Sequence, residues 1–283
     1  MAAHAYNPLP NRPWKDLGSD WKEKEEFGWK KRKVRGYIFS DKQEKKMIIA
    51  YKGTSFTFLP GGDDSTSPND RESDNLMFSC CCGTTNANWT PVCPCAKDRN
   101  LCDDKCIHQH AQMNTTYFHG ALAIYEEAKR RYPDAKFILT GHSLGGALAS
   151  LVAMEKNINA VTFEAPGERL YARRLGLDLE LKPETPFIYH FGNNADPIFM
   201  GTCNGKLSLC YLGGYGMDSK CHTNTKCTFD AIEDLGWLPS IFHHRIKEVV
   251  TEIFDDWADG YRNFTVSCVS KSNCTDCEDW KFK

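Results

Sequence analysis

Short apolar runs alternate with amphipathic segments through the middle of the chain. Apolar side chains recur at three- and four-residue steps over 116–132, which predicts a helix that ends before Pro133. The segments that follow alternate between the two kinds of element, with strands at 136–140, 158–163 and 187–191 and helices at 144–156 and 169–175. This order predicts an α/β fold in which helical crossovers join parallel strands.

The flanking segments carry different patterns. Two apolar runs, 34–40 and 47–51, stand on either side of a charged turn and predict a pair of strands. Residues 60–75 combine Gly, Pro, acidic and hydroxyl side chains, a composition typical of a loop. Helical spacing returns over 246–254, and the Trp-rich residues 1–33 predict either a short amphipathic helix or a packed arm.

Cysteines are unusually frequent and unevenly placed. The 283 residues include 14 cysteines, none of them between Cys106 and Cys203. An even number this large is typical of disulfide-bonded proteins of oxidising compartments, although the sequence leaves the pairing open. We expect one domain, 1–283, with a lid and cysteine-rich insertion at 55–115 and a second cysteine-rich insertion at 200–230. Four Asn-x-Ser/Thr sequons predict glycosylation in such a compartment: Asn88, Asn114, Asn263 and Asn273.

Charge and hydropathy narrow the class of protein further. The formal net charge of −2 gives no reason to expect nucleic acid as a partner. No apolar run reaches the ~18 residues that a transmembrane helix needs. Residues 1–13 lack the apolar core of a signal peptide, so we expect a luminal fragment from which the leader has been removed.

The segment 141–145 reads Gly-His-Ser-Leu-Gly, which matches the Gly-x-Ser-x-Gly pattern of a nucleophile elbow. An apolar strand precedes it and a helix of small residues follows it, as an elbow requires. Ser143 is therefore the expected nucleophile of a serine hydrolase. The N–H of Leu144, at the start of the next helix, is the expected first donor to an oxyanion. The competing interpretation is a packing turn with an incidental serine.

The acid of such a site follows the nucleophile along the chain. Asp196 is the best-placed candidate, because it comes just after the strand at 187–191 and stands before a proline. A simple turn aspartate is the alternative. Three rivals do not follow a comparable predicted strand: Asp178, Asp218 and Asp230.

The base follows the acid, which leaves His222, His243 and His244 as candidates. His222 lies within the second cysteine-rich insertion, where a structural role is expected. His243 and His244 both precede the last predicted helix, and the residues alone leave the choice between them open. Thr54, at the end of an earlier strand, is the expected second oxyanion donor unless this segment is only a strand-ending turn.

Several segments together resemble the class 3, fungal-type lipases, and among them the fungal autophagy lipases. The elbow at 138–149 and the strand end at 51–54 carry the resemblance to the larger group. The resemblance to the smaller group includes cysteine-containing stretches as well: 75–82, 163–167, 190–198, 200–205 and 243–246. It runs from Asn7 to Trp280.

The resemblance implies an α/β-hydrolase fold of the class 3 lipase kind, with a mostly parallel central sheet, helices on both faces and cysteine-rich insertions. It implies a triad of Ser143, Asp196 and the histidine of a His-Arg-Ile motif, which is His244, and neither metal nor cofactor. The implied substrates are membrane phospholipids of autophagic bodies and multivesicular-body vesicles in the vacuole or lysosome lumen. Family members reach that lumen through the endoplasmic reticulum and multivesicular bodies and carry an N-terminal membrane anchor, which we expect this chain to lack.

Residues 55–75, which leave the oxyanion strand, are the expected lid over the site. Gly61 and Gly62 would form its hinge. Its apolar side chains would then face a membrane: Phe56, Phe58 and Leu59. An ordinary insertion with a few core anchors is the alternative.

An acidic lumen would affect the base of the triad. The ordinary pKa of histidine is ~6.5, and a protonated imidazole cannot accept the serine proton. We therefore expect either that burial lowers the pKa of the base or that activity falls at acidic pH.

Other functions compete with a phospholipase. A triacylglycerol lipase is the nearest alternative among enzymes. A cysteine-rich lipid-binding module without catalysis is a different class of protein, and a module of this kind would bind zinc through one cluster: Cys93, Cys95, Cys102, Cys106, His108 and His110.

Overall fold

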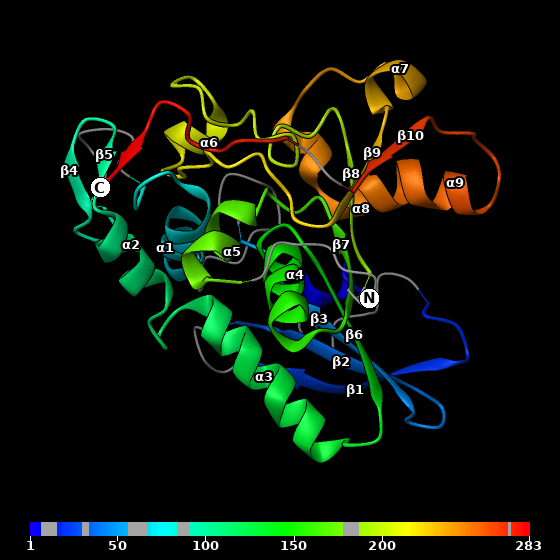
Figure 1. Cartoon of the computed structure of the whole chain (residues 1–283). Helices are drawn as coiled ribbons and strands as arrows, with labels where there is room; N and C mark the ends of the chain where they lie inside the picture. The colour runs from blue at the N-terminus through cyan, green and yellow to red at the C-terminus, as the bar shows by residue number, and fades with distance from the viewer. Residues whose placement is uncertain (7–15, 30–33, 56–66, 84–90, 178–186, 271–272) are drawn as a thin grey trace.

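The computed structural model describes residues 1–6, 16–29, 34–55, 67–83, 91–177, 187–270 and 273–283. Within these residues the central sheet has eight strands, which are β1 Trp21–Phe27, β2 Gly36–Asp41, β3 Lys46–Tyr51, β6 Lys136–His142, β7 Asn159–Phe163, β8 Ile188–Asn193, β9 Thr225–Phe229 and β10 Val266–Val269. Their order across the sheet is β1-β2-β3-β6-β7-β8-β9-β10 (Figure 1). Strands β3 to β9 of this order run parallel, while β1, β2 and β10 pair antiparallel at the two edges.

A second, small sheet joins the C-terminus to the first cysteine-rich region. It consists of β4 Ala96–Asp98, β5 Leu101–Cys102 and β11 Lys281–Phe282. The described helices are η1 His4–Tyr6, α1 Ser67–Phe78, α2 Asp104–Ala111, α3 Tyr117–Arg131, α4 Leu144–Lys156, α5 Arg169–Leu175, α6 Leu209–Leu212, α7 Ala231–Leu235, η2 Ile241–His244, α8 Ile246–Val249, η3 Val250–Phe254 and α9 Asp255–Ala258. The last three follow one another without a break and form one C-terminal helix.

Helices cover both faces of the central sheet, as expected from the sequence (Figure 1). Alternate side chains of a strand point to opposite faces, so Ile49 and Leu139 meet α3 and α4 in the main core. On the other face, Phe39 and its neighbours pack against η1, while Phe191 packs against the C-terminal helix. The parallel strands therefore end at one edge, between two helical layers, where loops can gather functional groups.

The predicted elements in the middle of the chain are confirmed, with shifts of one or two residues at some ends. The helix predicted over 144–156 is α4, and the one predicted over 169–175 is α5. The predicted pair of strands at 34–40 and 47–51 corresponds to β2 and β3. Strong apolar periodicity marks each of these elements, because each buries a continuous apolar face.

The loop predicted over 60–75 is wrong from Ser67 onward, where α1 begins. The inward side of this helix is polar, since Asp70, Asp74 and Asn75 are all buried. Pro68 stands in the first turn, where the missing N–H of a proline removes no helical hydrogen bond. Hydrophobic periodicity detects only helices with apolar inward faces, so it missed this one.

Two strands also lie where the sequence predicted something else. β1 lies within residues 1–33, for which we predicted a helix or a packed arm, and its side chains alternate between half-buried and exposed. β9 lies within the range 200–230 and pairs in parallel with β8, so this range contributes a strand to the central sheet. Both strands are rich in polar residues, which hid them from an analysis based on apolar runs.

All 14 cysteines are described and form disulfides, namely Cys80–Cys277, Cys81–Cys102, Cys82–Cys93, Cys95–Cys106, Cys203–Cys210, Cys221–Cys274 and Cys227–Cys268. The expectation of disulfides is confirmed. The alternative zinc cluster is wrong, because its four cysteines have no thiolate left to bind a metal.

Three of the four sequons fall on described residues: Asn114, Asn263 and Asn273, all of them exposed. Asn88 lies outside the described residues. In the part of the chain that the structure describes, no helix has the length and hydropathy to cross a membrane.

Candidate active site

Ser143 stands at the sharp turn between β6 and α4. Its φ of 58° lies in the left-handed region, which non-glycine residues seldom occupy outside strained functional turns. The turn is held because Ser143 N donates to the carbonyl oxygen of Phe163 at 3.0 Å. Gly145 permits the close approach of α4 to β3, since a Cβ there would lie 2.2 Å from the Tyr51 carbonyl oxygen. The local sequence therefore builds the elbow that the Gly-x-Ser-x-Gly pattern predicted.

The structure brings Ser143, His244 and Asp196 into one hydrogen-bonded line. His244 Nε2 lies 2.8 Å from Ser143 Oγ, and His244 Nδ1 lies 2.7 Å from Asp196 Oδ2. Asp196 follows β8, and its other carboxylate oxygen accepts from the N–H of Ile198 at 2.8 Å. All three side chains are buried, and Ser143 is only 2% exposed. This arrangement of a nucleophile, a base and an orienting acid is that of a catalytic triad.

The other two histidine candidates face away from Ser143. The ring of His243 stacks on Trp237 with centroids 4.0 Å apart, and its Nδ1 lies 3.0 Å from Glu248 Oε1. His222 is buried beneath α4, where its Nε2 donates to the Ala165 carbonyl oxygen at 2.8 Å. Burial, with His190 and Lys226 nearby, lowers the pKa of His222 to about 3. The structure therefore resolves the choice that the residues alone left open.

The rival acids have structural partners of their own. Asp230 accepts from the N–H of Glu233 and begins α7, while Asp218 accepts from the N–H of Cys80. Asp178 lies outside the described residues. The reason given against Asp230 was wrong, because β9 ends directly before it. What separates it from Asp196 is its partners, because Asp230 accepts from Asn194 Nδ2 and Glu233 N, while Asp196 is the one that meets His244 Nδ1.

The sequence analysis missed the contribution of His142, the second residue of the elbow motif, to this site. Its Nε2 donates to the carbonyl oxygen of His244 at 2.7 Å, while the Tyr6 hydroxyl lies 2.6 Å from its Nδ1. Burial, and next the neighbouring His244, hold the pKa of His142 well below the usual range. A neutral His142 thus ties the backbone of the base to the N-terminal segment. No local pattern predicts this contact, because Tyr6 is 136 residues away.

The oxyanion role of Thr54 and Leu144 stays a prediction; Gly53, next to Thr54, lies against the elbow, since a Cβ there would be 3.0 Å from Ser143 Cβ. Leu144 is the first residue of α4, and the first N–H groups of a helix lack intrahelical acceptors and carry its positive dipole end. Thr54 is buried just after β3, and its hydroxyl donates to Asp74 Oδ2 at 2.7 Å. Burial, and then the charge of Asp70, hold the pKa of Asp74 well above its ordinary value. The structure thus adds Asp74 of α1 to the site, a residue that the sequence analysis had placed in a loop.

Comparison with known proteins gives a family for this arrangement. A family model described as a Tle-like phospholipase domain matches residues 95–174. Over the whole chain, a protein named "Putative lipase ATG15" from Pichia angusta is 41% identical, and those of Candida glabrata and Saccharomyces cerevisiae are 42% and 41% identical. The chain belongs to the ATG15 lipase family. It spans about half the length of these relatives, covering 52%, 56% and 54% of them.

Solved structures of fungal lipases also align with this ATG15 family chain. The Lip2 lipase of Yarrowia lipolytica aligns with a TM-score of 0.42 at 17% identity, covering 81% of this chain and 75% of that one. Lipase II of Rhizopus niveus aligns with a TM-score of 0.38 at 16% identity, covering 80% and 76%. The α/β-hydrolase fold expected from the sequence is confirmed by the chain's own sheet order and by its strand-elbow-helix unit.

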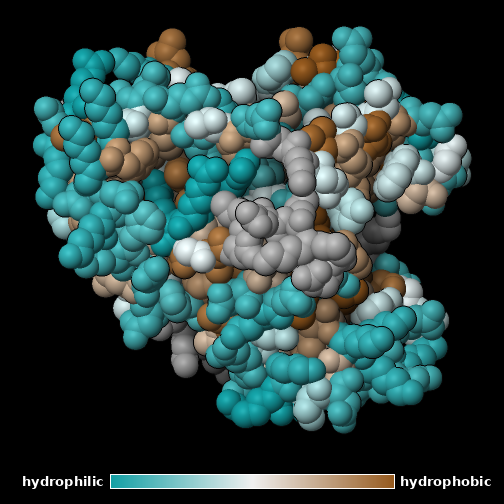
Figure 2. Space-filling view, viewed as in Figure 1, coloured by the Kyte–Doolittle hydropathy of each residue, from teal (hydrophilic) through white to brown (hydrophobic). Residues whose placement is uncertain are grey.

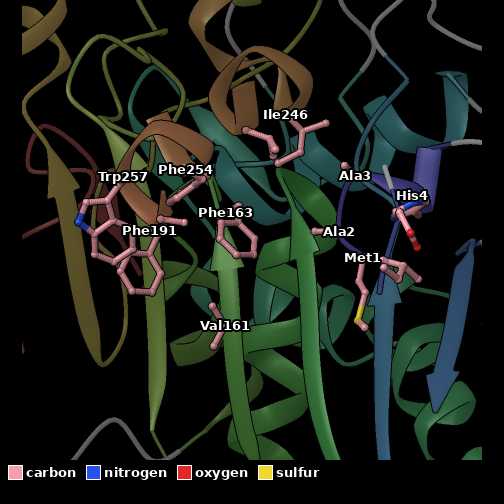
Figure 3. A pocket seen from close by; sticks show the side chains of 14 residues that line it. Met1, Ala2, Ala3, His4, Val161, Phe163, Phe191, Ile246, Phe254 and Trp257 are labelled. Carbon is pink, nitrogen blue, oxygen red and sulfur yellow. The ribbon is translucent and has the colours of Figure 1, made fainter. Parts of the chain in front are cut away.

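An apolar pocket of about 410 Å³ opens on the face of the sheet away from α4 (Figure 3). Phe163 and Phe191 form its floor, the C-terminal helix forms one wall, and residues 1–4 form the other. Among the described residues that line it, none belongs to the Ser143 triad, although Ile246 follows His244 by two positions. In this ATG15 family member this apolar pocket and the Ser143 triad are therefore different places.

The described residues include only part of the predicted lid. Its apolar residues Phe56, Phe58 and Leu59 and its hinge at Gly61 and Gly62 lie outside the described residues. From Ser67 onward the predicted lid is the start of α1, whose Asp74 accepts a hydrogen bond from the Thr54 hydroxyl.

Proposed function

We propose that this chain is a serine lipase that hydrolyses acyl esters of membrane phospholipids. The observation that carries the proposal is the unbroken line from Ser143 through His244 to Asp196, with both hydrogen-bond distances below 3 Å. The names of the ATG15 relatives and of the phospholipase family model support a lipid ester as the substrate.

The reaction follows from the geometry of these groups. Ser143 Oγ attacks the acyl carbonyl while His244 accepts its proton and Asp196 stabilises the imidazolium that forms. The N–H groups of Leu144 and Thr54 receive the developing oxyanion. His244 then protonates the departing lysolipid, and a water molecule activated by the same histidine releases the fatty acid.

Exposed leucines support a membrane as the source of the substrate. Leu207, 90% exposed, stands in the loop before α6, and Leu238, 79% exposed, follows α7. In Figure 1, α6 and α7 lie along the margin toward which the parallel strands run, and Figure 2 shows apolar tips at two separate points of that margin. Ser143 and Asp196 also follow strand ends at this edge, so a lipid surface touching both tips would face the site.

The compartment is part of the same proposal. Disulfides at every cysteine and exposed sequons support an oxidising lumen reached through the endoplasmic reticulum. We propose the vacuole or lysosome lumen, with autophagic bodies and multivesicular-body vesicles as the membranes that are hydrolysed. Localisation of a tagged full-length protein, together with the fate of such vesicles in cells that lack it, tests this part.

The deciding experiment is turnover on defined phospholipid vesicles. Ser143→Ala should abolish release of fatty acid, because no other group in the line can attack the carbonyl, and it should leave the melting temperature nearly unchanged. Ser267→Ala, at an exposed position on β10, is the matched control and should retain full activity.

Three outcomes would contradict the proposal. Fatty-acid release by Ser143→Ala at the wild-type rate would refute the assignment of the nucleophile. Turnover on triacylglycerol emulsions with none on phospholipid vesicles would favour the triacylglycerol lipase alternative. Binding of vesicles without turnover, and without labelling of Ser143 by a fluorophosphonate, would favour a lipid-binding module.

A further inference from the structure

Tyr6 has no part in the proposed mechanism, although its side chain lies against the nucleophile elbow. It is the last residue of η1, the short N-terminal helix, and its N–H donates to the Ala3 carbonyl oxygen at 3.3 Å. The preceding residue, Ala5, is fully buried among side chains of β2 and β3. The central sheet therefore fixes the place from which the Tyr6 side chain reaches the site.

Two hydrogen bonds lead from Tyr6 to the backbone of the base. The Tyr6 hydroxyl lies 2.6 Å from His142 Nδ1, and His142 Nε2 lies 2.7 Å from the carbonyl oxygen of His244. A carbonyl oxygen can only accept, so the proton of the His142 ring is on Nε2. Because buried His142 is neutral, its Nδ1 carries a lone pair, and the Tyr6 hydroxyl is the donor. Both hydrogen bonds thus have a defined direction, from Tyr6 through His142 to His244.

The same hydroxyl also lies against the strand end that precedes the expected oxyanion donor. A Cβ at Gly53 would be 2.1 Å from the Tyr6 hydroxyl oxygen and 2.4 Å from the His142 carbonyl oxygen, so this close approach requires glycine. Lys52, one residue earlier, places its Nζ 5.2 Å from the centroid of the Tyr6 ring, within reach of a cation–π interaction. Tyr6 is therefore packed between the end of β3 and the elbow.

The carbonyl that His142 holds belongs to the residue whose ring must meet Ser143. His244 is the last residue of η2, a single short turn, and the rings of His142 and His244 lie with centroids 4.8 Å apart. A shift of this backbone would move His244 Nε2 away from Ser143 Oγ, which it now approaches to 2.8 Å. A misplacement of about 1 Å at a reacting group can cost about 100-fold in rate. A support on the His244 carbonyl therefore bears directly on catalysis.

We propose that Tyr6 is a positioning residue, whose hydroxyl holds the His142 ring and through it keeps His244 aligned with Ser143. Tyr6 acts through His142 and contacts no reacting atom. The inference rests on the proposed hydrolysis by Ser143, and it extends the site to the N-terminal helix, 136 residues before the elbow in sequence. The competing interpretation is that the Tyr6 hydroxyl only stabilises the fold.

A pair of tyrosine variants separates positioning from stability. Tyr6→Phe removes only the hydroxyl and should lower kcat on a soluble short-chain ester about tenfold with little change in KM, because the ester still binds while the base is misaligned. Tyr171→Phe is the matched control. The Tyr171 hydroxyl is buried and donates to the Ala111 carbonyl oxygen at 3.0 Å, so this variant also loses one buried hydrogen bond. It should lower the melting temperature but keep the wild-type kcat.

A double-mutant cycle tests whether Tyr6 acts through His142. His142→Phe keeps a ring in place but breaks both hydrogen bonds, so it should lower kcat at least as much as Tyr6→Phe does. Adding Tyr6→Phe to His142→Phe should then change kcat by less than about twofold, because the route to His244 is already broken. Losses that multiply in the double variant would show that Tyr6 does not act through His142.

Amide hydrogen exchange gives a second readout that needs no turnover. The N–H groups of His243 and Arg245 donate to the carbonyl oxygens of Ser240 and Phe242, at 3.0 and 3.2 Å, and so report on the turn that carries the base. In a Ser143→Ala background, Tyr6→Phe should speed the exchange of these two amides about tenfold. Tyr171→Phe should leave their exchange unchanged.

Three results would overturn the inference. A wild-type kcat in Tyr6→Phe would show that the hydroxyl does not position the base. Equal losses of kcat in Tyr6→Phe and Tyr171→Phe would show a general effect of stability. Unchanged exchange of the two amides in Tyr6→Phe would refute the link to His244. Faster exchange in a chain that hydrolyses no ester would instead refute the proposed function and support the link, so the two failures are distinguishable.

Discussion

His243 and His244 are adjacent in sequence, yet their side chains have different partners. The 3-10 turn of η2 points one ring at Trp237 and Glu248 and the other at Ser143 and Asp196. A pair of identical side chains in one turn therefore serves as an internal control for the assignment of the base.

Replacing each histidine by alanine should give very different enzymes. His244→Ala should lower kcat/KM roughly 10,000-fold, because Ser143 loses the acceptor for its proton. His243→Ala should cost less than about tenfold, since it removes a stacking contact at the surface of the turn. Steady-state kinetics on one soluble ester measure both. A larger loss in His243→Ala would reassign the base.

Thr54 offers a test of the oxyanion site at a single hydroxyl. Thr54→Val keeps the shape of the side chain but removes the hydrogen bond to Asp74 that positions the Thr54 backbone N–H, and we expect kcat to fall about 100-fold with little change in KM. Thr54→Ser retains the hydroxyl and should keep most of the activity. A wild-type kcat in Thr54→Val would mean that this hydroxyl does not position the oxyanion donor.

The residues that could be predicted from the sequence are those with a local signature or a fixed order. Ser143 stands in a motif on a strand-to-helix turn, and Asp196 follows a recognisable strand. His244 needed the family resemblance to be separated from His243. Asp74 and the contact between Tyr6 and His142 had no such signal, because what they contact lies far away in the chain. Their roles come from packing, which sequence patterns do not record.

At the scale of elements, predictability followed the polarity of the buried face. α3 and α4 bury apolar residues at regular steps, and the sequence predicted both. α1 buries carboxylates and an amide, and β9 carries half-buried threonine and lysine side chains, and neither element was predicted. A buried polar face is stable only when partners satisfy it, so its presence cannot be known before those partners are placed.

One such polar contact joins α4, α5 and β8 inside the fold. Glu168, just before α5, accepts from Ser150 of α4 at 2.8 Å and lies 3.2 Å from His190 Nε2 of β8. Burial alone would raise the pKa of Glu168, but His190, His222 and a hydrogen bond from Thr223 outweigh it and lower the pKa to about 2. The ionised glutamate thus stabilises the packing of three elements.

The stabilisation by Glu168 should depend on pH with a definite sign. Its folded pKa of about 2 lies below the ordinary value of 4.5, so the contribution is complete above pH 4.5 and is lost as pH falls through about 2. Glu168→Gln should therefore lower the free energy of unfolding by about 3 kcal/mol near neutral pH, because His190 loses a buried acidic partner. Chemical denaturation across this range measures the difference.

A surface pair supplies the control for that measurement. Glu126→Gln breaks an ion pair with Lys156, where the glutamate is 55% exposed. Exposed pairs contribute about 0–1 kcal/mol, so this variant should resemble the wild type at every pH. Equal destabilisation of the two variants would argue against a special role for the buried glutamate.

For the molecule as a whole, the exposed side chains of Leu207 and Leu238 predict which edge contacts a membrane. Replacing Leu207 and Leu238 by serine should weaken binding to phospholipid vesicles at least about tenfold, since each leucine that enters hydrocarbon contributes roughly 1.5–3 kcal/mol. Turnover of a soluble short-chain ester should not change. Cosedimentation with vesicles and parallel assays on the two substrates measure these effects.

Phe187 provides the matched control for that experiment. It is 46% exposed, but it precedes β8 and so lies at the opposite end of the strand from Asp196. Phe187→Ser should leave vesicle binding intact if only the active-site edge touches the membrane. Equal losses in both variants would indicate a nonspecific dependence on surface hydrophobicity and would refute an oriented encounter.

The disulfide between Cys80 and Cys277 can form only late in the synthesis of the chain. Cys80 lies beside Cys81 and Cys82, whose partners follow within 21 and 11 residues, while its own partner comes 197 residues later. At a synthesis rate of about 5–20 residues per second, Cys80 waits roughly 10 to 40 seconds as a thiol next to two newly formed disulfides. A waiting thiolate exchanges with such neighbours, so the nascent chain depends on a compartment that can reshuffle them. The segment directly after α1 is therefore fixed to Cys277 only late in synthesis.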